Sequence, residues 1–197
     1  MQLSKTGYYA DFAIYAALVG TCAVAAAFED EWSQWLKWVG AFAAGAALWT
    51  LLEYSLHRFV LHRRNVFSTM HARHHASPRA FIGTPTWLSL AVLASAVFLP
   101  AWIMTSLNVA SGVMAGVALG FLWYGILHHA IHHRRPRLIA CLALTATQRH
   151  RLHHHTSRRG NFGVTTPVWD WLFRTALETR PHGAHGTAHA RAGVSAR

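Results

Sequence analysis

Long apolar runs separated by short polar segments dominate the first two thirds of the chain. The longest run extends from Ala80 to Leu127 and holds no charged residue and no histidine. A helix needs about 20 apolar residues to cross a bilayer, so this run predicts two membrane spans, and two shorter runs predict two earlier ones. In the last span Gly112, Gly116 and Gly120 recur every four residues, which lets a neighbouring helix approach closely. The sequence thus predicts an all-α integral membrane protein with four transmembrane helices, at about residues 12–28, 38–56, 87–107 and 109–127.

The polar segments between these runs differ in charge. The segment after the first span carries Glu29, Asp30 and Glu31, whereas the segments after the second and fourth spans are rich in arginine. By the positive-inside rule, the arginine-rich segments 57–80 and 128–180 form a cytoplasmic helical cap, and both termini are cytoplasmic too. In a bacterium the protein would lie in the inner membrane.

Composition adds a strong basic excess. The chain has 18 Lys and Arg against 7 Asp and Glu, a formal net charge of +11. Membrane orientation and attraction to anionic lipids account for much of it, so we expect no nucleic-acid partner. Cys22 and Cys141 each lie in an apolar run, which excludes a thiolate zinc site and a disulfide scaffold. Residues 1–180 are predicted to form one membrane-embedded domain, and 181–197, rich in Gly, Ala, Arg and His, a disordered tail.

Histidine is the most unusual part of the composition. Of the sixteen histidines, ten recur in the cap segments at spacings that place two or three imidazoles on one helix face. Imidazole suits zinc, copper, iron and nickel, and a tetrahedral zinc needs only four ligands. Ten nitrogens therefore predict two metals with about five ligands each. The predicted ligands are His57, His62, His71, His74, His75, His128, His132, His150, His153 and His154.

Six histidines fall outside this pattern. Three are extra residues within the clusters and are interpreted as bystanders, and three lie in the tail. They are His129, His133, His155, His182, His185 and His189.

Three further residues are candidates for supporting roles. Glu53 lies four residues before His57 and shares a helix face with it, so we expect it either to orient that imidazole or to pair with an arginine. Asp170 is expected to hydrogen-bond a ligand histidine or an arginine. Tyr124, four residues before His128, either lines the route of substrate or oxygen or serves in packing. The sequence predicts no catalytic residue beyond the metal ligands.

The order His-x4-His, His-x2-His-His, His-x3-His, His-x2-His-His resembles the fatty acid hydroxylase/sterol desaturase superfamily of membrane oxygenases. The segments Glu53–Phe59, Asn161–Thr166 and Trp169–Phe173 also look like that family, and the resemblance covers about Trp49–Thr175. It implies a non-haem centre of two iron ions that uses dioxygen and two external electrons to hydroxylate or desaturate a membrane lipid. The electrons would come from a separate haem or iron–sulfur carrier protein with its reductase. Zinc could replace iron in purified protein.

Several functions stay open at this stage. The leading prediction is hydroxylation of a C–H bond in a lipid or fatty acyl chain, and the alternative is a carotenoid or sterol-type hydroxylase or desaturase. In fatty acid 2-hydroxylases we would expect an aspartate after Tyr124, where this chain has Gly125. A histidine-rich metal-binding or transport protein is disfavoured, because transporters place their polar ligands near the bilayer midplane. A haem protein would need about two to four facing histidines. The oligomeric state is not predicted.

Overall fold

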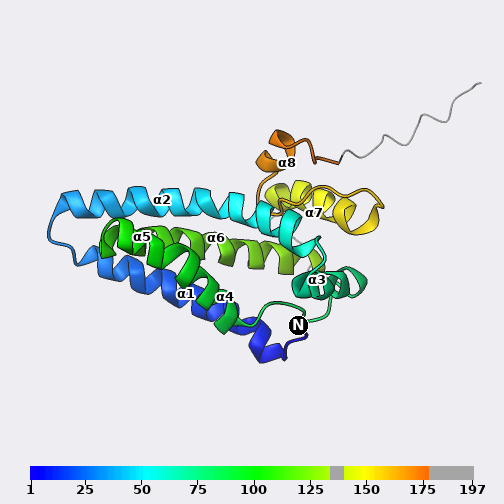
Figure 1. Ribbon diagram of the computed structural model, residues 1–197, viewed down its shortest axis with the longest axis horizontal. Coiled ribbons are helices and arrows are strands. Elements are labelled where there is room, and N and C mark those ends of the chain that lie inside the picture. The colour runs from blue at the N-terminus through cyan, green and yellow to red at the C-terminus, as the bar shows by residue number, and fades with distance from the viewer. Residues whose placement is uncertain (134–139, 178–197) are drawn as a thin grey trace, which may run out of the picture.

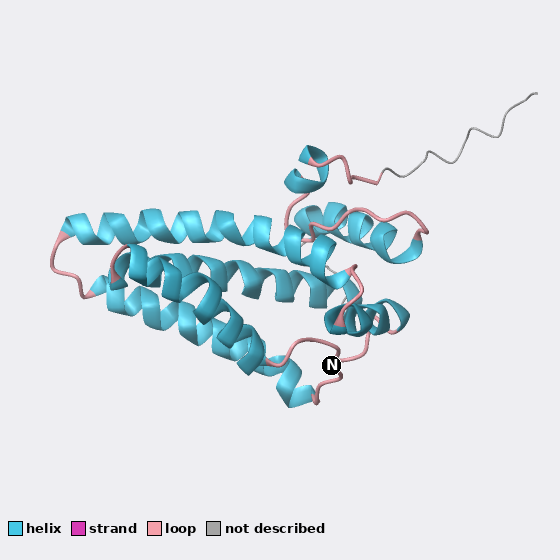
Figure 2. Cartoon of the chain, viewed as in Figure 1, coloured by secondary structure: helices cyan, strands magenta, loops and turns pink. Residues whose placement is uncertain are grey.

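The computed structural model describes residues 1–133 and 140–177, and in these ranges the regular structure is helical apart from one isolated β-bridge between Gln2 and Ile82. Helices run along the length of the molecule and a cluster of shorter helices covers one end (Figures 1 and 2). In chain order the elements are α1 (Lys5–Ala27), α2 (Trp32–Ser55), the π-helical segment η1 (Leu56–Leu61), α3 (Val66–Ala76), α4 (Thr86–Leu93), the π-helical segment η2 (Ala94–Phe98), α5 (Leu99–Met104), α6 (Leu107–His133), α7 (Ala140–His155) and α8 (Val168–Leu172).

Among the described residues, four helical stretches are long and apolar enough to cross a membrane, as the sequence predicts. They cover Lys5–Ala27, Trp32–Leu61, Thr86–Met104 and Leu107–His133. The second and fourth extend beyond their predicted ends at residues 56 and 127. Segments 57–61 and 128–133, predicted as parts of the cap, continue the long helices, and apolar residues such as Phe59, Leu61 and Ile131 recur within them. His57, His128 and His132 lie on these helix ends.

Close backbone packing between α2 and α6 forms the centre of the bundle. A Cβ atom added to Gly116 would lie 2.1 Å from the Phe42 carbonyl oxygen, and one added to Gly112 would lie 2.7 Å from that of Trp38. Gly45 of α2 reciprocates, since its added Cβ would lie 2.2 Å from the carbonyl oxygen of Val113. The glycines of the fourth span thus allow the close approach of a neighbouring helix that the sequence predicts, and that helix is α2.

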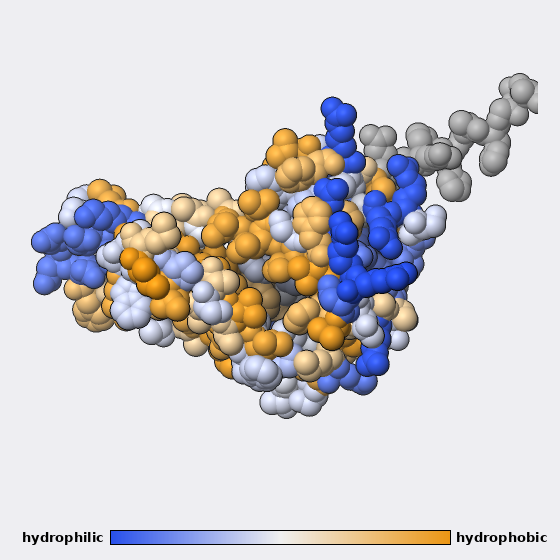
Figure 3. Space-filling view, viewed as in Figure 1, coloured by the Kyte–Doolittle hydropathy of each residue, from blue (hydrophilic) through white to orange (hydrophobic). Residues whose placement is uncertain are grey.

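The two ends of the bundle differ in charge. The turn between α1 and α2 contains Glu29–Glu31, all exposed, and lies at the end opposite α3 and α7 (Figure 1). The N-terminal segment lies near α3, where the Leu3 amide donates to the Phe81 carbonyl oxygen at 2.8 Å. The hydrophilic surface gathers at these two ends, with apolar surface between them (Figure 3).

A capping box starts the cap helix α3. The Asn65 side chain accepts hydrogen bonds from the amides of Phe67 and Ser68, and the Ser68 hydroxyl closes the box on the Asn65 amide. This arrangement satisfies amides that the first helical turn leaves free. It fixes where α3 begins, and hence where its three histidines point.

Candidate metal centre

The ten predicted ligands come together in two groups of five. Within each group the candidate ligand nitrogens all lie within 4.8 Å of one another. The first group contains His57, His62, His71, His75 and His153. The second group contains His74, His128, His132, His150 and His154. The division into two sets of five agrees with the sequence prediction.

Helices α3 and α7 each supply both groups. On α3, His71 and His75 belong to the first group while His74 belongs to the second. On α7, His150 and His154 belong to the second group and His153 to the first. Of the two or three imidazoles expected on one face, each trio thus places two in one group and the third in the other. Successive helical residues are rotated by about 100°, so the middle member of each trio lies to one side of the i, i+4 pair.

The π-helical segment η1 explains the irregular pair His57 and His62. A π-helix closes its hydrogen bonds between residues five apart, so these two rings lie on one side of the helix. Their ring centroids are 5.2 Å apart. The five-residue spacing thus serves the same purpose here that a four-residue spacing serves in an α-helix.

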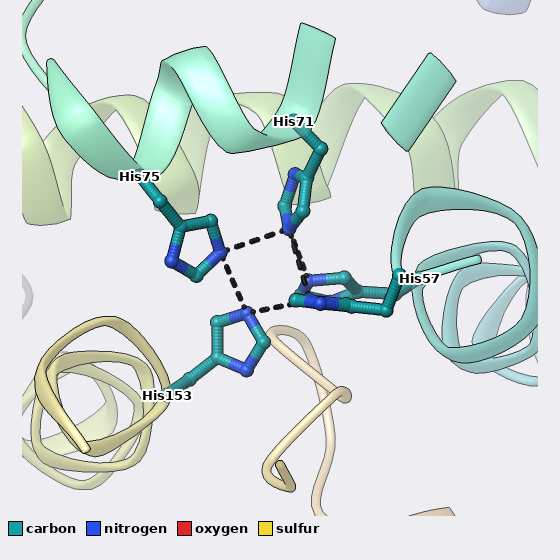
Figure 4. Close-up of side chains that lie close together, drawn as sticks. His57, His71, His75 and His153 are labelled. Carbon is teal, nitrogen blue, oxygen red and sulfur yellow. Dashed lines mark hydrogen bonds between the residues drawn. The ribbon is translucent and has the colours of Figure 1, made fainter. Parts of the chain in front are cut away.

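Ring nitrogens of the first group point at a common centre (Figure 4). The Nε2 atom of His71 lies 3.1 Å from those of His57 and His62 and 3.0 Å from that of His75. The Nε2 atom of His153 lies 3.1 Å from that of His75 and 3.2 Å from that of His62. A neutral Nε2 either donates one proton or accepts one, so mutual hydrogen bonds cannot satisfy all five.

Two rings of this group have a defined tautomer. The Nδ1 atom of His57 lies 2.6 Å from the Phe162 carbonyl oxygen, and that of His153 lies 2.8 Å from the Gly160 carbonyl oxygen. A carbonyl oxygen only accepts, so each Nδ1 carries the proton. Each Nε2 then presents its lone pair to the centre of the group, as a metal ligand must.

The donor set fits metal ions. Imidazole nitrogens about 2.0–2.1 Å from a zinc-sized metal stand roughly 3 Å from one another, as the Nε2 atoms of the first group do. In the second group the Nε2 atoms of His132 and His150 are 3.0 Å apart. The Nε2 atoms of His74 and His154 are buried and, among the described residues, have no hydrogen-bond partner. Buried polar atoms are seldom left unpaired, and a bound metal would pair these two.

The surroundings keep the imidazoles neutral. Burial, reinforced by neighbouring imidazoles, lowers the pKa of His62 and His75 to about 4 and that of His74 to about 3. The same causes hold the pKa of His150 well below its usual value. Near neutral pH these rings are uncharged, so their lone pairs are free to bind a metal.

Glu53 differs from the sequence expectation. Its carboxylate accepts hydrogen bonds from the amides of Val164 and Thr165 and from the Thr165 hydroxyl, in place of an imidazole or an arginine. Glu53 therefore holds the loop that follows α7 against the end of α2.

Asp170 holds the same loop from the other side. Its carboxylate accepts from the amides of Phe162 and Gly163 at 2.9 and 2.8 Å and from the Thr175 hydroxyl at 2.7 Å. The expected contact with a ligand histidine is thus indirect, because Asp170 binds the amide of Phe162 and His57 binds the carbonyl of the same residue. The alternative partner, an arginine, is met by electrostatic attraction to Arg149.

Sequence reasoning misses the loop carbonyls as partners of the histidines. Asn161 has a φ of 53°, and its side chain donates to the Arg149 carbonyl oxygen and accepts from the Leu177 amide. Gly163 has no room for a side chain, since an added Cβ would lie 2.1 Å from the Thr166 carbonyl oxygen. The positive φ of Asn161 is a left-handed conformation that asparagine tolerates better than most residues. The Asn-Phe-Gly run is the signal of a tight turn, and that turn aims the carbonyls of residues 160 and 162 at the imidazoles.

Tyr124 lies against the second group. Its ring stacks on that of His128, with centroids 5.4 Å apart and planes at 15°, and it also contacts Trp49. It is therefore a packing partner of a predicted ligand.

The bystander histidines belong to neither group. The Tyr8 hydroxyl lies 3.2 Å from Nδ1 of His129, His133 stacks on Phe81, and His155 is exposed. The predicted tail 181–197, with its three histidines, lies outside the described residues.

Comparison with known proteins identifies the family. A family model described as fatty acid hydroxylase matches residues 42–175. The chain belongs to the fatty acid hydroxylase family. Both histidine groups lie entirely within the matched part.

Relatives of this family member include enzymes from animals and plants. The chain is 29% identical over 157 residues to fatty acid 2-hydroxylase of Homo sapiens, which covers 73% of this chain and 41% of that protein. It is 28% identical over 152 residues to a dihydroceramide fatty acyl 2-hydroxylase of Arabidopsis thaliana, covering 68% and 59%. The match thus spans less than two thirds of either relative. The chain thus matches 2-hydroxylases although it has Gly125 where an aspartate is expected in those enzymes.

A solved structure has the same fold. It is that of full-length scs7p, in which only the hydroxylase domain is visible. The TM-score is 0.72 at 24% identity, and the match covers 88% of this chain and 68% of that chain.

Proposed function

We propose that this family member hydroxylates a C–H bond of a lipid or fatty acyl chain, using two iron ions, dioxygen and two external electrons. The observation that carries the proposal is the pair of five-imidazole groups at one end of four apolar helices. The similarity to a fatty acid 2-hydroxylase and a dihydroceramide fatty acyl 2-hydroxylase favours an acyl chain oxidised at its 2-position over a carotenoid or sterol substrate.

Iron, bound in both groups, would supply the activation of dioxygen that an unactivated C–H bond requires. The chain's own residues do the positioning. The five imidazoles of each group would hold one ion, and the carbonyls of Gly160 and Phe162 keep two rings in the ligating tautomer. The apolar helices would hold the acyl chain, and Tyr124, stacked on His128, would border its route to the second group.

We also propose that the histidine end faces the cytoplasm, together with the N-terminus. The arginines of the cap and the acidic turn at the opposite end support this orientation. A separate carrier protein would deliver electrons from the same side. A cavity of about 410 Å³ there is lined by His62, His71 and His75 of the first group, which gives this group a face toward water.

Comparing lipids with and without the enzyme tests the function. The chain would be expressed in a heterologous host with candidate electron carriers, and its lipids compared with those from His74→Ala, His153→Ala and His155→Ala. We expect the wild type and His155→Ala to add one oxygen atom to acyl chains and to carry close to two metals per chain. His74→Ala and His153→Ala, one from each group, should lose the product and much of the metal. Full metal content in both variants would refute the metal assignment, and no oxygenated lipid in any host would refute the reaction.

A further inference from the structure

A second cavity lies beside the first group and is lined by arginines. Its volume is about 310 Å³. Its lining residues are Arg58, Phe59, His62, Arg63, Arg159, Phe162 and Thr175. Three guanidinium groups thus meet in one depression, and among the described residues that line it there is no carboxylate.

Among the described residues, no carboxylate forms an ion pair with the arginines of this cavity. Glu53 and Asp170 are buried and accept hydrogen bonds from the loop that follows α7. Asp11, near the start of α1, hydrogen-bonds Thr86 of α4. Arg58 donates to the Tyr54 hydroxyl, a neutral partner, at 2.6 Å. Arg63 and Arg159 are exposed. An anionic ligand would therefore meet uncompensated charge.

An exposed apolar patch adjoins the cavity. On α8 and just after it, Trp171 is 65% exposed, Leu172 63% and Phe173 48%. Phe59, which lines the cavity, is 49% exposed. The Phe173 ring stacks on Tyr54, the partner of Arg58, with centroids 5.4 Å apart, so the patch and the cavity are contiguous.

The patch lies at the depth of a membrane-spanning helix. The Trp169 indole donates to the Thr50 hydroxyl at 3.0 Å, and Thr50 lies inside the second span, which ends at Leu61. At a rise of 1.5 Å per residue this is roughly 15 Å before the end of that span. Figure 1 shows α8 beside that end of α2, and in Figure 3 apolar surface in this region borders a hydrophilic band. The apolar side chains thus lie at bilayer depth, with the arginines nearer the cap.

We infer that the cavity and the apolar patch together form a binding site for an anionic phospholipid. The arginines would bind the phosphate of its head group, since guanidinium matches phosphate oxygens with paired hydrogen bonds. The patch, defined by Phe59, Trp171, Leu172 and Phe173, would contact its acyl chains. An acidic protein partner would use the charge but would not need apolar side chains at bilayer depth. The inference rests on the helices spanning a bilayer, and not on the metal chemistry.

Native mass spectrometry of the delipidated full chain in detergent tests this site, with phosphatidylglycerol and phosphatidylcholine as probes. We expect phosphatidylglycerol to bind more tightly, and the variant Arg63→Gln/Arg159→Gln to weaken it about thirtyfold, because each basic side chain facing an anionic lipid contributes about a factor of five. The single variant Arg159→Gln should weaken phosphatidylglycerol binding about fivefold. Arg159 lies further from the predicted ligands in sequence than Arg63 does. Metal content measured on the same samples identifies any variant that disturbs the first group.

The matched control is Arg73→Gln/Arg151→Gln, which removes two exposed arginines from α3 and α7 outside the cavity. It should change the affinity by less than about threefold. Equal losses in both double variants would overturn the inference, because the lipid would then respond to net charge alone. Displacement of the lipid by equimolar inorganic phosphate would also overturn it, since the patch would contribute nothing. The inference would also be overturned if Arg63→Gln/Arg159→Gln bound the lipid as tightly as the wild type but was reduced more slowly by an acidic carrier protein. The cavity would then be a docking site for a protein.

Discussion

The two histidine groups contain five imidazoles each, yet the protein holds them differently. In the first group the carbonyls of Phe162 and Gly160 fix two rings, and three rings line a cavity. In the second group the Nε2 atoms of His74 and His154 are buried and unpaired among the described residues, and aromatic packing holds His128. The first group is thus ordered by hydrogen bonds to the backbone, and the second by packing and, we propose, by the metal itself.

Replacing Asp170 by alanine should separate the groups most strongly. The change leaves the amides of Phe162 and Gly163 and the Thr175 hydroxyl without their buried acceptor, and should cost about 3 kcal/mol or more of unfolding free energy. Metal content should fall from about two per chain toward one, because the loop carbonyls of Gly160 and Phe162 bond rings of the first group. Thermal unfolding and elemental analysis measure both effects. Asp30→Ala, in the exposed turn, is the control, and two metals retained in Asp170→Ala would show that the loop does not order the first group.

Removing the ring of Tyr124 should act on the second group. Tyr124→Ala deletes a partly buried ring stacked on His128, so we expect a loss of about 2 kcal/mol and of second-group metal. Tyr124→Phe keeps the ring and should change stability by no more than about 0.5 kcal/mol. If both variants lose metal equally, the hydroxyl and not the packing matters.

Glu53→Gln should weaken the first group mildly. The amide keeps one oxygen for the amides of Val164 and Thr165 and loses the acceptor of the Thr165 hydroxyl, at a cost of about 1 kcal/mol. Metal should remain near two per chain, with a lowered affinity at one site, measured by titration with a competing chelator. Loss of one metal ion per chain would instead show that Glu53 supports the first group as strongly as Asp170 does.

Chelation should release the two metals at different rates. His62 and His75 are only partly buried and line a cavity, so the first-group metal should leave faster. Metal released over time should follow two phases, and the fast phase should be missing from Asp170→Ala. A single phase that carries both metals would mean that the groups are equally accessible.

The sequence predicts the members of the site better than their arrangement. Charge-free runs predict the four spans, and the spacing of Gly112, Gly116 and Gly120 predicts a close helix contact, because both properties are local. The partner of those glycines, α2, is not encoded locally. The ten candidate ligands can likewise be selected from local spacing, whereas the opposite directions of His74 and His75 depend on the exact rotation of α3.

The roles of the two acids could not be predicted for a related reason. Glu53 binds the backbone of Val164, 111 residues away, and backbone amides are the same in every residue. A carboxylate near a histidine in sequence suggests a side-chain partner, but folding brings a loop between them. Residue type thus indicates that Glu53 needs donors, while only the fold shows which donors it finds.

The π-helical segment η1 makes the number of residues between His57 and His62 more important than their identity. A π-turn amounts to one residue inserted into an α-helix. An α-helix with the same number of residues would place His62 about 140° around the axis from His57. Deleting one residue along with the π-turn would instead return the pair to the four-residue spacing that shares a helix face. Substitutions at Phe59 or Val60 leave that count intact. In the evolution of this chain, the π-turn and its extra residue would therefore be gained or lost together.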